Sequence, residues 1–445
     1  MVSSTPTATT LSRRGLGLGA LALAAMRSGP AAASTSPGKG PTARRVIFLC
    51  MAGGPSHVDT FDPKPALRRD EGKTVGAGRR RGRLMASPWK HTGHGESGIE
   101  ISELFPGVAS HADKLCLLRG MTARVPAHPQ AFLELHTGTS QFVRPSVGAW
   151  TVYGLGTENQ NLPGFISLAP PTGNGGGQNY GGGFLPPGSG GTPIRGRGFG
   201  GDAGSIANIA GPHDAARRRR RLDLIGDLGR ISGAGDGSTD AVIATHELAF
   251  RMQGEAAEVL DAAAEPAAAR EAYGLNDSAT RKFGTQCLMA RRLVESGVRF
   301  VELHHGGWDQ HNNLRENLAK NAAAVDGPIA ALLRDLDGRG LLDETLVLWG
   351  GEFGRTPFVQ GSDGRDHNHR GFTMWMAGGG VRGGHVHGAT DQHGTEAVEG
   401  VMDVHDLHAT ILAALGLDHE SLTFNYAGRD FRLTDVHGNV ADVFG

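Results

Sequence analysis

Cysteine and long apolar runs are scarce in this chain. Only three cysteines occur in its 445 residues, Cys50, Cys116 and Cys287, and they lie far apart in apolar surroundings. An odd number of widely spaced cysteines does not suit the disulfide framework of a small secreted domain, so we expect three small buried hydrophobic residues. No run of about 18 strongly apolar residues occurs, so we expect no transmembrane helix in the mature chain.

Net charge is nearly absent as well. Lysine and arginine number 44 against 45 aspartates and glutamates, which leaves a formal charge of -1. This balance gives no electrostatic reason to expect nucleic acid or an anionic membrane surface as a partner. The arginine runs at 79–83 and 217–221 contain no interleaved aromatic residues. They therefore predict solvated surface rather than a nucleic-acid groove.

Glycine and histidine are abundant instead. The 70 glycines predict long irregular loops, and the 20 histidines favour metal or proton chemistry. Glycine dominates residues 173–212, a segment too long for an ordinary connection. We expect this insertion to be either a functional flap or a disordered segment.

The N-terminal residues have the pattern of an export signal. Arg13 and Arg14 precede a modest apolar core from Leu16 to Met26, and alanines at 31–33 offer a cleavage site. This pattern predicts a twin-arginine signal peptide over 1–33, a linker over 34–44, and a periplasmic or otherwise exported protein. Because this pathway carries folded proteins, often with their cofactor inserted, it is a first hint of a metal site.

Three segments of the single large domain, residues 45–445, repeat one plan. Apolar strands are predicted at 45–51, 299–303 and 345–349, and each is followed within a few residues by a glycine pair. In open α/β sheets the carboxyl ends of such strands border the ligand crevice. A further strand is predicted at 114–119, and helices are predicted at 132–138, 239–264, 279–296 and 317–336. These elements indicate an α/β fold with strand-helix-strand crossovers.

Acidic and histidine side chains follow these strands. The candidate ligands are His57, Asp59, Asp309, His311, Glu352, Asp366, His367 and His369. They supply hard oxygen and borderline nitrogen donors for one or more divalent ions, with Zn, Ca and Mn not distinguished. The alternative for each loop is that these side chains only cap turns. Three such loops in one chain favour ligands that converge at one edge of a parallel sheet.

Several longer motifs closely resemble the DUF1501 family of twin-arginine-exported bacterial proteins, many of them from planctomycetes and often labelled sulfatases. The motifs are GGPSHVDTFDPKP from Gly53, GGWDQHNN from Gly306, GEFGRTP from Gly351, GRDHNHRGFTMWMAGGGVRGGHVHGATD from Gly364 and NYAGRDFRLTDVHG from Asn425. The family in turn looks like a branch of the alkaline phosphatase and sulfatase superfamily. That likeness implies a three-layer α/β/α sandwich with a mostly parallel central sheet and a metal site.

The likeness also implies ligand positions. Glu352 stands where the superfamily has an Asp, although Phe353 replaces the His that follows it. The other positions implied are Asp309 and His311 for an earlier Asp and His, either His367 or His369 for a late His, and Asp59 for the Asp after the first strand.

The nucleophile position departs from the sulfatase pattern. Leu135-His136-Thr137-Gly138 keeps the end of that pattern, and counting back places its nucleophile on His128. Histidine cannot become formylglycine, so the sulfatase mechanism is not carried over. His128 could instead be a further ligand, a general acid or base, or a phosphate-accepting nucleophile. Thr60 is a second candidate nucleophile, and Arg355 either pairs with a substrate oxyanion or forms only a salt bridge.

These observations favour an exported metal-dependent hydrolase of sulfate or phosphate esters, acting on a small-molecule or glycan substrate. The Asp and His clusters and the export signal support that interpretation. The alternative is a non-catalytic alkaline phosphatase-like domain that binds glycans or partner proteins at the cell surface. The missing formylglycine position and Phe353 support the alternative.

Overall fold

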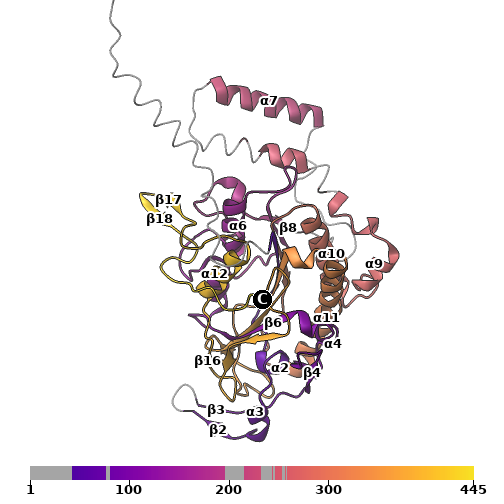
Figure 1. Cartoon of the computed structure of the whole chain (residues 1–445), viewed down its shortest axis with the longest axis vertical. Coiled ribbons are helices and arrows are strands. Elements are labelled where there is room, and N and C mark those ends of the chain that lie inside the picture. The colour runs from indigo at the N-terminus through magenta and orange to yellow at the C-terminus, as the bar shows by residue number, and fades with distance from the viewer. Residues whose placement is uncertain are drawn as a thin grey trace, which may run out of the picture.

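The apolar segments of the chain form one central sheet (Figure 1). The computed structural model describes residues 43–76, 81–195, 215–231, 246–252 and 258–445, with the single positions 243 and 256. The predicted signal peptide, the linker up to residue 42, residues 196–212 of the glycine-rich insertion and part of the predicted helix 239–264 lie outside these residues. Within the described ranges, no helix is both long enough and apolar enough to cross a bilayer.

Eight strands make up this sheet. They are β1 (Arg45–Met51), β6 (Leu115–Met121), β7 (Phe165–Leu168), β8 (Thr192–Ile194), β9 (Phe300–His305), β10 (Thr345–Gly350), β13 (Phe372–Ala377) and β14 (His385–His387). Their order in space is β14-β6-β13-β10-β1-β9-β7-β8. β13 is antiparallel to both of its neighbours, and every other adjacent pair is parallel.

Both faces of the sheet are buried under helices. Side chains alternate along a strand, so Ile47 and Leu49 join one apolar cluster while Val46 and Phe48 join the other. The first cluster includes residues of α10 (Arg281–Glu295) and α11 (Leu314–Gly338), and the second includes residues of α5 (His128–Thr137), α6 (Val147–Leu155) and α12 (Val404–Ala414). Figure 1 shows α10 and α11 on the opposite side of the sheet from α6 and α12. The predicted three-layer α/β/α sandwich is confirmed.

The remaining elements are short, apart from α7. The helices are α2 (His57–Thr60), α3 (Pro65–Arg69), α4 (Pro106–Ala109), α7 (Ala215–Ile231) and α9 (Ala267–Ala272). The small strand pairs are β2 (Thr74–Val75) with β3 (Gly82–Arg83), β4 (His91–His94) with β5 (Ile99–Ser102), β11 (Gly354–Arg355) with β12 (His367–Asn368), β15 (Ala389–Thr390) with β16 (Ala397–Glu399), and β17 (Phe424–Tyr426) with β18 (Arg429–Phe431). Of these, β11 and β12 contribute directly to the site described below.

The predicted strands lie where the sequence indicates, and one helix start differs in a useful way. β1 covers 45–51 as expected, and β9 and β10 extend one or two residues beyond their predicted ends. Helix α5 begins at His128 rather than at residue 132, because Ala127 is extended and Pro129 lies in the first turn, where a missing N–H costs nothing. The three cysteines are buried and free, as expected.

The sheet topology brings three loops to one edge. β9, β1 and β10 are adjacent and parallel, so the loops that follow them leave the sheet at the same end. Those loops carry Asp309, Gly53 and Glu352, and the first residue of α5 meets them there.

Candidate metal centre

Gly53 lets these loops approach closely. Its φ is +119°, and a Cβ at this position would lie 2.6 Å from the backbone nitrogen of Asp309. Its N–H donates to Glu352 at 3.0 Å to Oε1 and 3.2 Å to Oε2, and its carbonyl accepts a bond from Arg355. A side chain at position 53 would therefore separate the loops that carry Asp309 and Glu352.

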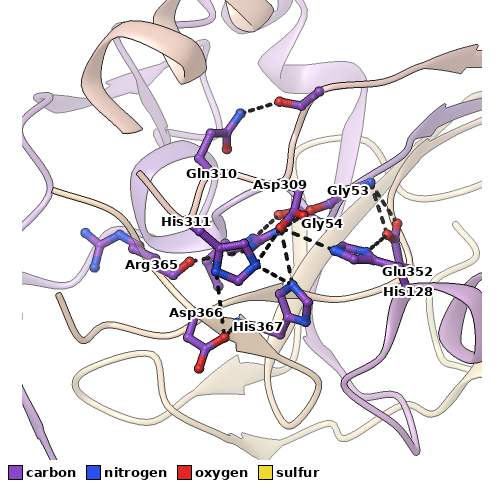
Figure 2. A network of polar contacts seen from close by, with 12 residues as sticks. Gly53, Gly54, His128, Asp309, Gln310, His311, Glu352, Arg365, Asp366 and His367 are labelled. Atoms are coloured by element: carbon purple, nitrogen blue, oxygen red, sulfur yellow. Dashed lines mark hydrogen bonds and ion pairs between the residues drawn. The ribbon is translucent and has the colours of Figure 1, made fainter. Parts of the chain in front are cut away.

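Three imidazole nitrogens surround one carboxylate oxygen, as Figure 2 shows. Asp309 Oδ1 lies 2.9 Å from His311 Nε2, 3.2 Å from His367 Nε2 and 3.3 Å from His128 Nε2. The Nε2 atoms of His311 and His367 are 2.9 Å apart. We call His128, Asp309, His311 and His367 the Asp309 centre.

The other nitrogen of each ring faces an oxygen. His128 Nδ1 lies 2.6 Å from Glu352 Oε1, His311 Nδ1 lies 2.5 Å from Gln360 Oε1, and His367 Nδ1 lies 2.6 Å from the carbonyl of Pro126. A carbonyl oxygen only accepts, and an ionised carboxylate only accepts, so these contacts assign the proton to Nδ1 in each neutral ring. The three Nε2 lone pairs then point toward one another and toward Asp309. Such a convergence is unfavourable unless a cation or protons lie between them.

The residues present fit a divalent cation. Donors in a tetrahedral site with metal–nitrogen distances of about 2.0–2.1 Å lie about 3.3 Å from one another. The distances measured from Asp309 Oδ1 are close to that value. Histidine ligands of metals almost always donate their second N–H to a carboxylate, an amide or a backbone carbonyl. Glu352, Gln360 and Pro126 supply that outer set here.

Without a cation, the charges of the centre depend on one another. Burial lowers the pKa of His128, but hydrogen bonds to Asp309 and Glu352 outweigh it and raise that pKa to about 9. Burial raises the pKa of Asp309, but hydrogen bonds from His128 and His367 and the Arg355 guanidinium hold it well below its ordinary value. The side chain of Asp309 is 43% exposed and that of His311 is 31% exposed, so the centre borders solvent.

Phe353 packs against the imidazoles. Its ring is buried and its centroid lies 4.8 Å from that of His128 and 4.6 Å from that of His367. Gly54, with φ at +75°, leaves room for this ring, because a Cβ there would come within 2.7 Å of it. Phe353 occupies the position where the superfamily likeness implies a histidine ligand. Its ring instead packs against His128 and His367 and so helps to hold both imidazoles in place.

Arg355 positions Asp309 from the buried side of the centre. It is fully buried, and it donates to the carbonyls of Gly53, Gly54 and Arg365 and, at 2.6 Å, to Asp309 Oδ1. A guanidinium with these partners orients the carboxylate and is not available to a substrate oxyanion. In β11 and β12 it is the register partner of His367, so one ladder places both side chains at Asp309.

Asp59 lies outside the Asp309 centre. Both of its oxygens accept from Arg365, at 2.7 and 3.1 Å, and Oδ2 also accepts from the Ser56 hydroxyl at 2.6 Å. The sequence predicts Asp59 as a ligand by its place after the first strand. The structure replaces that role with a buried ion pair, because α2 begins at once and turns the carboxylate toward Arg365.

Two other residues of α2 have structural partners. His57 Nε2 donates to the carbonyl of Gly394 at 2.9 Å, and burial lowers the pKa of this imidazole. Thr60 is buried, and its hydroxyl donates to the carbonyl of Ser56 at 2.8 Å. Neither side chain belongs to the Asp309 centre, so in this arrangement Thr60 is not positioned as a nucleophile.

The late loop contributes one histidine to the centre. His367 belongs to it, and His369 does not. Asp366 is 63% exposed, its Oδ1 lies 3.9 Å from His311 Nδ1, and the same oxygen accepts the N–H of His367 at 2.8 Å. Asp366 therefore shapes the loop beside the centre. Glu352, predicted as a ligand, holds His128 and Gly53 instead.

Two supporting residues were missed in the sequence. Gln360 and Pro126 accept the Nδ1 protons of His311 and His367. No local pattern marks such acceptors, because one is an amide on a turn and the other is a backbone carbonyl.

Three solved structures similar to this chain are distant matches. A sulfatase from Pseudoalteromonas sp. is 15% identical, with a TM-score of 0.35 over 86% of this chain and 69% of that chain. A lipoteichoic acid synthase from Listeria monocytogenes is 9% identical, with a TM-score of 0.36 over 90% and 78%. The alkaline phosphatase from the Antarctic bacterium TAB5 is 10% identical, with a TM-score of 0.31 over 76% and 92%. These scores add nothing to the case for any activity.

The sequence itself gives a firmer result. A search of curated proteins returns no match. The model of one family, described as a protein of unknown function, matches residues 43–444, which is nearly the whole chain outside the predicted signal and linker. The match confirms the resemblance stated above for the motifs from Gly53 onward. The chain belongs to the DUF1501 family.

Proposed function

We propose that this protein is an exported, metal-dependent hydrolase of sulfate or phosphate esters, with its active site at the Asp309 centre. The observation that supports the proposal is the convergence of three imidazole Nε2 atoms on one carboxylate oxygen at the solvent-facing end of the sheet. In this proposal Asp309, His311 and His367 hold the ion, and three donors leave a position for the substrate. Imidazole donors favour zinc over calcium and manganese, which suit oxygen ligands.

The ion would supply Lewis acidity toward an oxygen of the sulfate or phosphate group. His128 would then act on the substrate, as its place at the nucleophile position of the sulfatase pattern implies, with its Nε2 3.3 Å from Asp309 Oδ1. Glu352 accepts the proton of Nδ1 and is itself fixed by Gly53, so Nε2 is presented to the centre in one orientation. From there it can give a proton to a leaving oxygen or take one from attacking water.

A second candidate function rests on the number of donors. If His128 is a fourth ligand, the tetrahedral set is complete, as in structural metal sites, and no position is left for a substrate. The protein would then be a metal-stabilised domain that binds glycans or partner proteins. The two candidates differ in one property of His128, since it is either a group that acts on substrate or a ligand.

Replacement of His128 separates them. If His128 acts on substrate, His128→Ala should keep its metal content and lose roughly 10²-fold or more in turnover on any sulfate or phosphate ester that the wild type cleaves. The measurement is elemental analysis together with a panel of aryl sulfates and phosphates. His369→Ala, two residues after His367 but outside the centre, serves as the control. Loss of metal from His128→Ala, with no ester cleaved by the wild type, would support the closed site and contradict the hydrolase.

The export part of the proposal rests on the N-terminal motif. Replacing Arg13 and Arg14 together by lysine keeps the charge and removes the twin-arginine pair. We expect the unprocessed precursor to accumulate in the cytoplasm, as followed by fractionation and immunoblotting. Normal processing of that double variant would contradict twin-arginine export.

A further inference from the structure

A second carboxylate with two histidines lies inside the fold. Glu302 and His304 are two residues apart on β9, so their side chains lie on the same face of the sheet. Register pairs Cys50 of β1 with His304, and Ser167 of β7 with Glu302. His136 of α5 packs over the same face and contacts Glu302. We call Cys50, His136, Ser167, Glu302 and His304 the Glu302 group, and all five residues are buried.

Glu302 is held from two sides. Its Oε1 lies 2.5 Å from His136 Nε2, and its Oε2 lies 3.2 Å from both Ser167 Oγ and His304 Nε2. These contacts fix the position of the carboxylate within a buried layer before any ligand binds.

Two features of the group point to a further ligand. The Cys50 sulfur, one oxygen of Glu302 and one nitrogen of His304 all lie within 4.8 Å of one another. His304 Nδ1 is buried and has no hydrogen-bond partner among the described residues, and the side chain of His304 is only 4% exposed, so water does not replace that partner. An unpaired buried nitrogen is costly, and it deserves an explanation such as an ion.

We propose that Cys50, Glu302 and His304 form a second, structural metal site that binds zinc. One thiolate, one carboxylate and one imidazole are ligands that zinc accepts together, and the thiolate excludes calcium and magnesium. Two negative ligands neutralise a divalent cation, which a buried site requires. Ser167 lies beside the ligands, with its hydroxyl 3.1 Å from His304 Nε2, and His136 orients the free side of Glu302.

This site is separate from the proposed active site in its chemistry. The Asp309 centre contains no sulfur, and the zinc at Cys50 is enclosed by the sheet and α5. The Cys50 thiol is buried and would lose its proton on binding the ion. Binding of zinc at this site would accompany folding. If the folded protein bound no zinc here, the proposed hydrolase at the Asp309 centre would be unaffected.

Cobalt provides the test, because thiolate bound to Co²⁺ absorbs in the near ultraviolet and nitrogen or oxygen ligands do not produce that band. The full chain refolded with Co²⁺ should show the band, and Cys50→Ser should lose it. Cys116→Ser and Cys287→Ser change equally buried free cysteines and should keep it. Asp309→Ala should also keep it, which separates this proposal from the proposed function.

X-ray absorption of the zinc-loaded wild type covers the case in which Cys50→Ser does not fold. We expect sulfur scattering at about 2.3 Å from zinc. A zinc-loaded chain with only nitrogen and oxygen neighbours, or a cobalt band that persists in Cys50→Ser, would overturn the second site.

Discussion

The Asp309 centre and the Glu302 group use the same residue types in different places. Each gathers histidines around one carboxylate, and each takes a side chain from α5, His128 at its first residue and His136 two turns later. Asp309 follows the end of a strand and is 43% exposed, whereas Glu302 lies within a strand and is fully buried. The first position borders solvent and the second is closed to it. Position relative to the strand end, more than residue type, distinguishes the proposed active site from the proposed structural site.

The largest effect that would sharpen this comparison is loss of Asp309. Asp309→Ala removes the oxygen on which three histidines converge, so we expect at least a 100-fold loss of metal affinity at this centre and a lower melting temperature in the metal-loaded protein. Metal titration by calorimetry, with the melting curve of each variant, measures both. His369→Ala, at a histidine outside the centre, is the control and should change neither. Wild-type metal affinity in Asp309→Ala would remove Asp309 from the site.

A matched pair of glutamate replacements tests the contrast directly. Glu302→Gln breaks a buried charge pair and should destabilise the protein by about 3–5 kcal/mol, as measured by chemical denaturation. Glu352→Gln keeps a side-chain oxygen for Gly53 and should destabilise it less, while lowering metal affinity or turnover at the Asp309 centre by 10–100-fold. If Glu302→Gln impaired the Asp309 centre more than Glu352→Gln did, the separation of roles would be wrong.

The smallest expected effect concerns Phe353. Phe353→Leu keeps an apolar side chain but loses the ring contacts with His128 and His367, worth about 0.5–1.5 kcal/mol. We expect metal content to be retained and turnover to fall only a few-fold, as followed by steady-state kinetics on the best ester substrate. Complete loss of metal in this variant would mean that Phe353 does more than pack.

Much of the fold could be predicted from apolar runs followed by glycine. The strands at 45–51 and 345–350 are uninterrupted apolar segments, and a buried parallel strand requires that pattern. Convergence of the loops after β9 and β10 followed from the same rule about strand ends. The meeting of these loops with His128 was implied by the superfamily likeness alone, because the apolar pattern placed the start of this helix four residues too late.

Asp59 shows where local patterns mislead. The prediction of both His57 and Asp59 as ligands requires an extended segment in which the two side chains point the same way. Ser56 and Asp59 have instead the spacing of a helix-capping pair, and α2 forms directly after β1. That signal was present in the sequence, but the partner of Asp59, Arg365, lies 306 residues away and no spacing rule could identify it.

The histidines of the late loop show a second limit. His367 and His369 are equivalent in sequence, and only the pairing of His367 with Arg355 in β11 and β12 directs one of them to Asp309. Such a choice depends on a two-residue ladder between segments that no propensity predicts.

The most direct test of the central claim is a crystal structure of the purified protein with diffraction data collected at the absorption edge of the metal found by elemental analysis. The account predicts an anomalous peak about 2.0–2.2 Å from His311 Nε2, His367 Nε2 and an oxygen of Asp309. A peak elsewhere in a metal-containing crystal, with these three side chains joined only by hydrogen bonds, would contradict it.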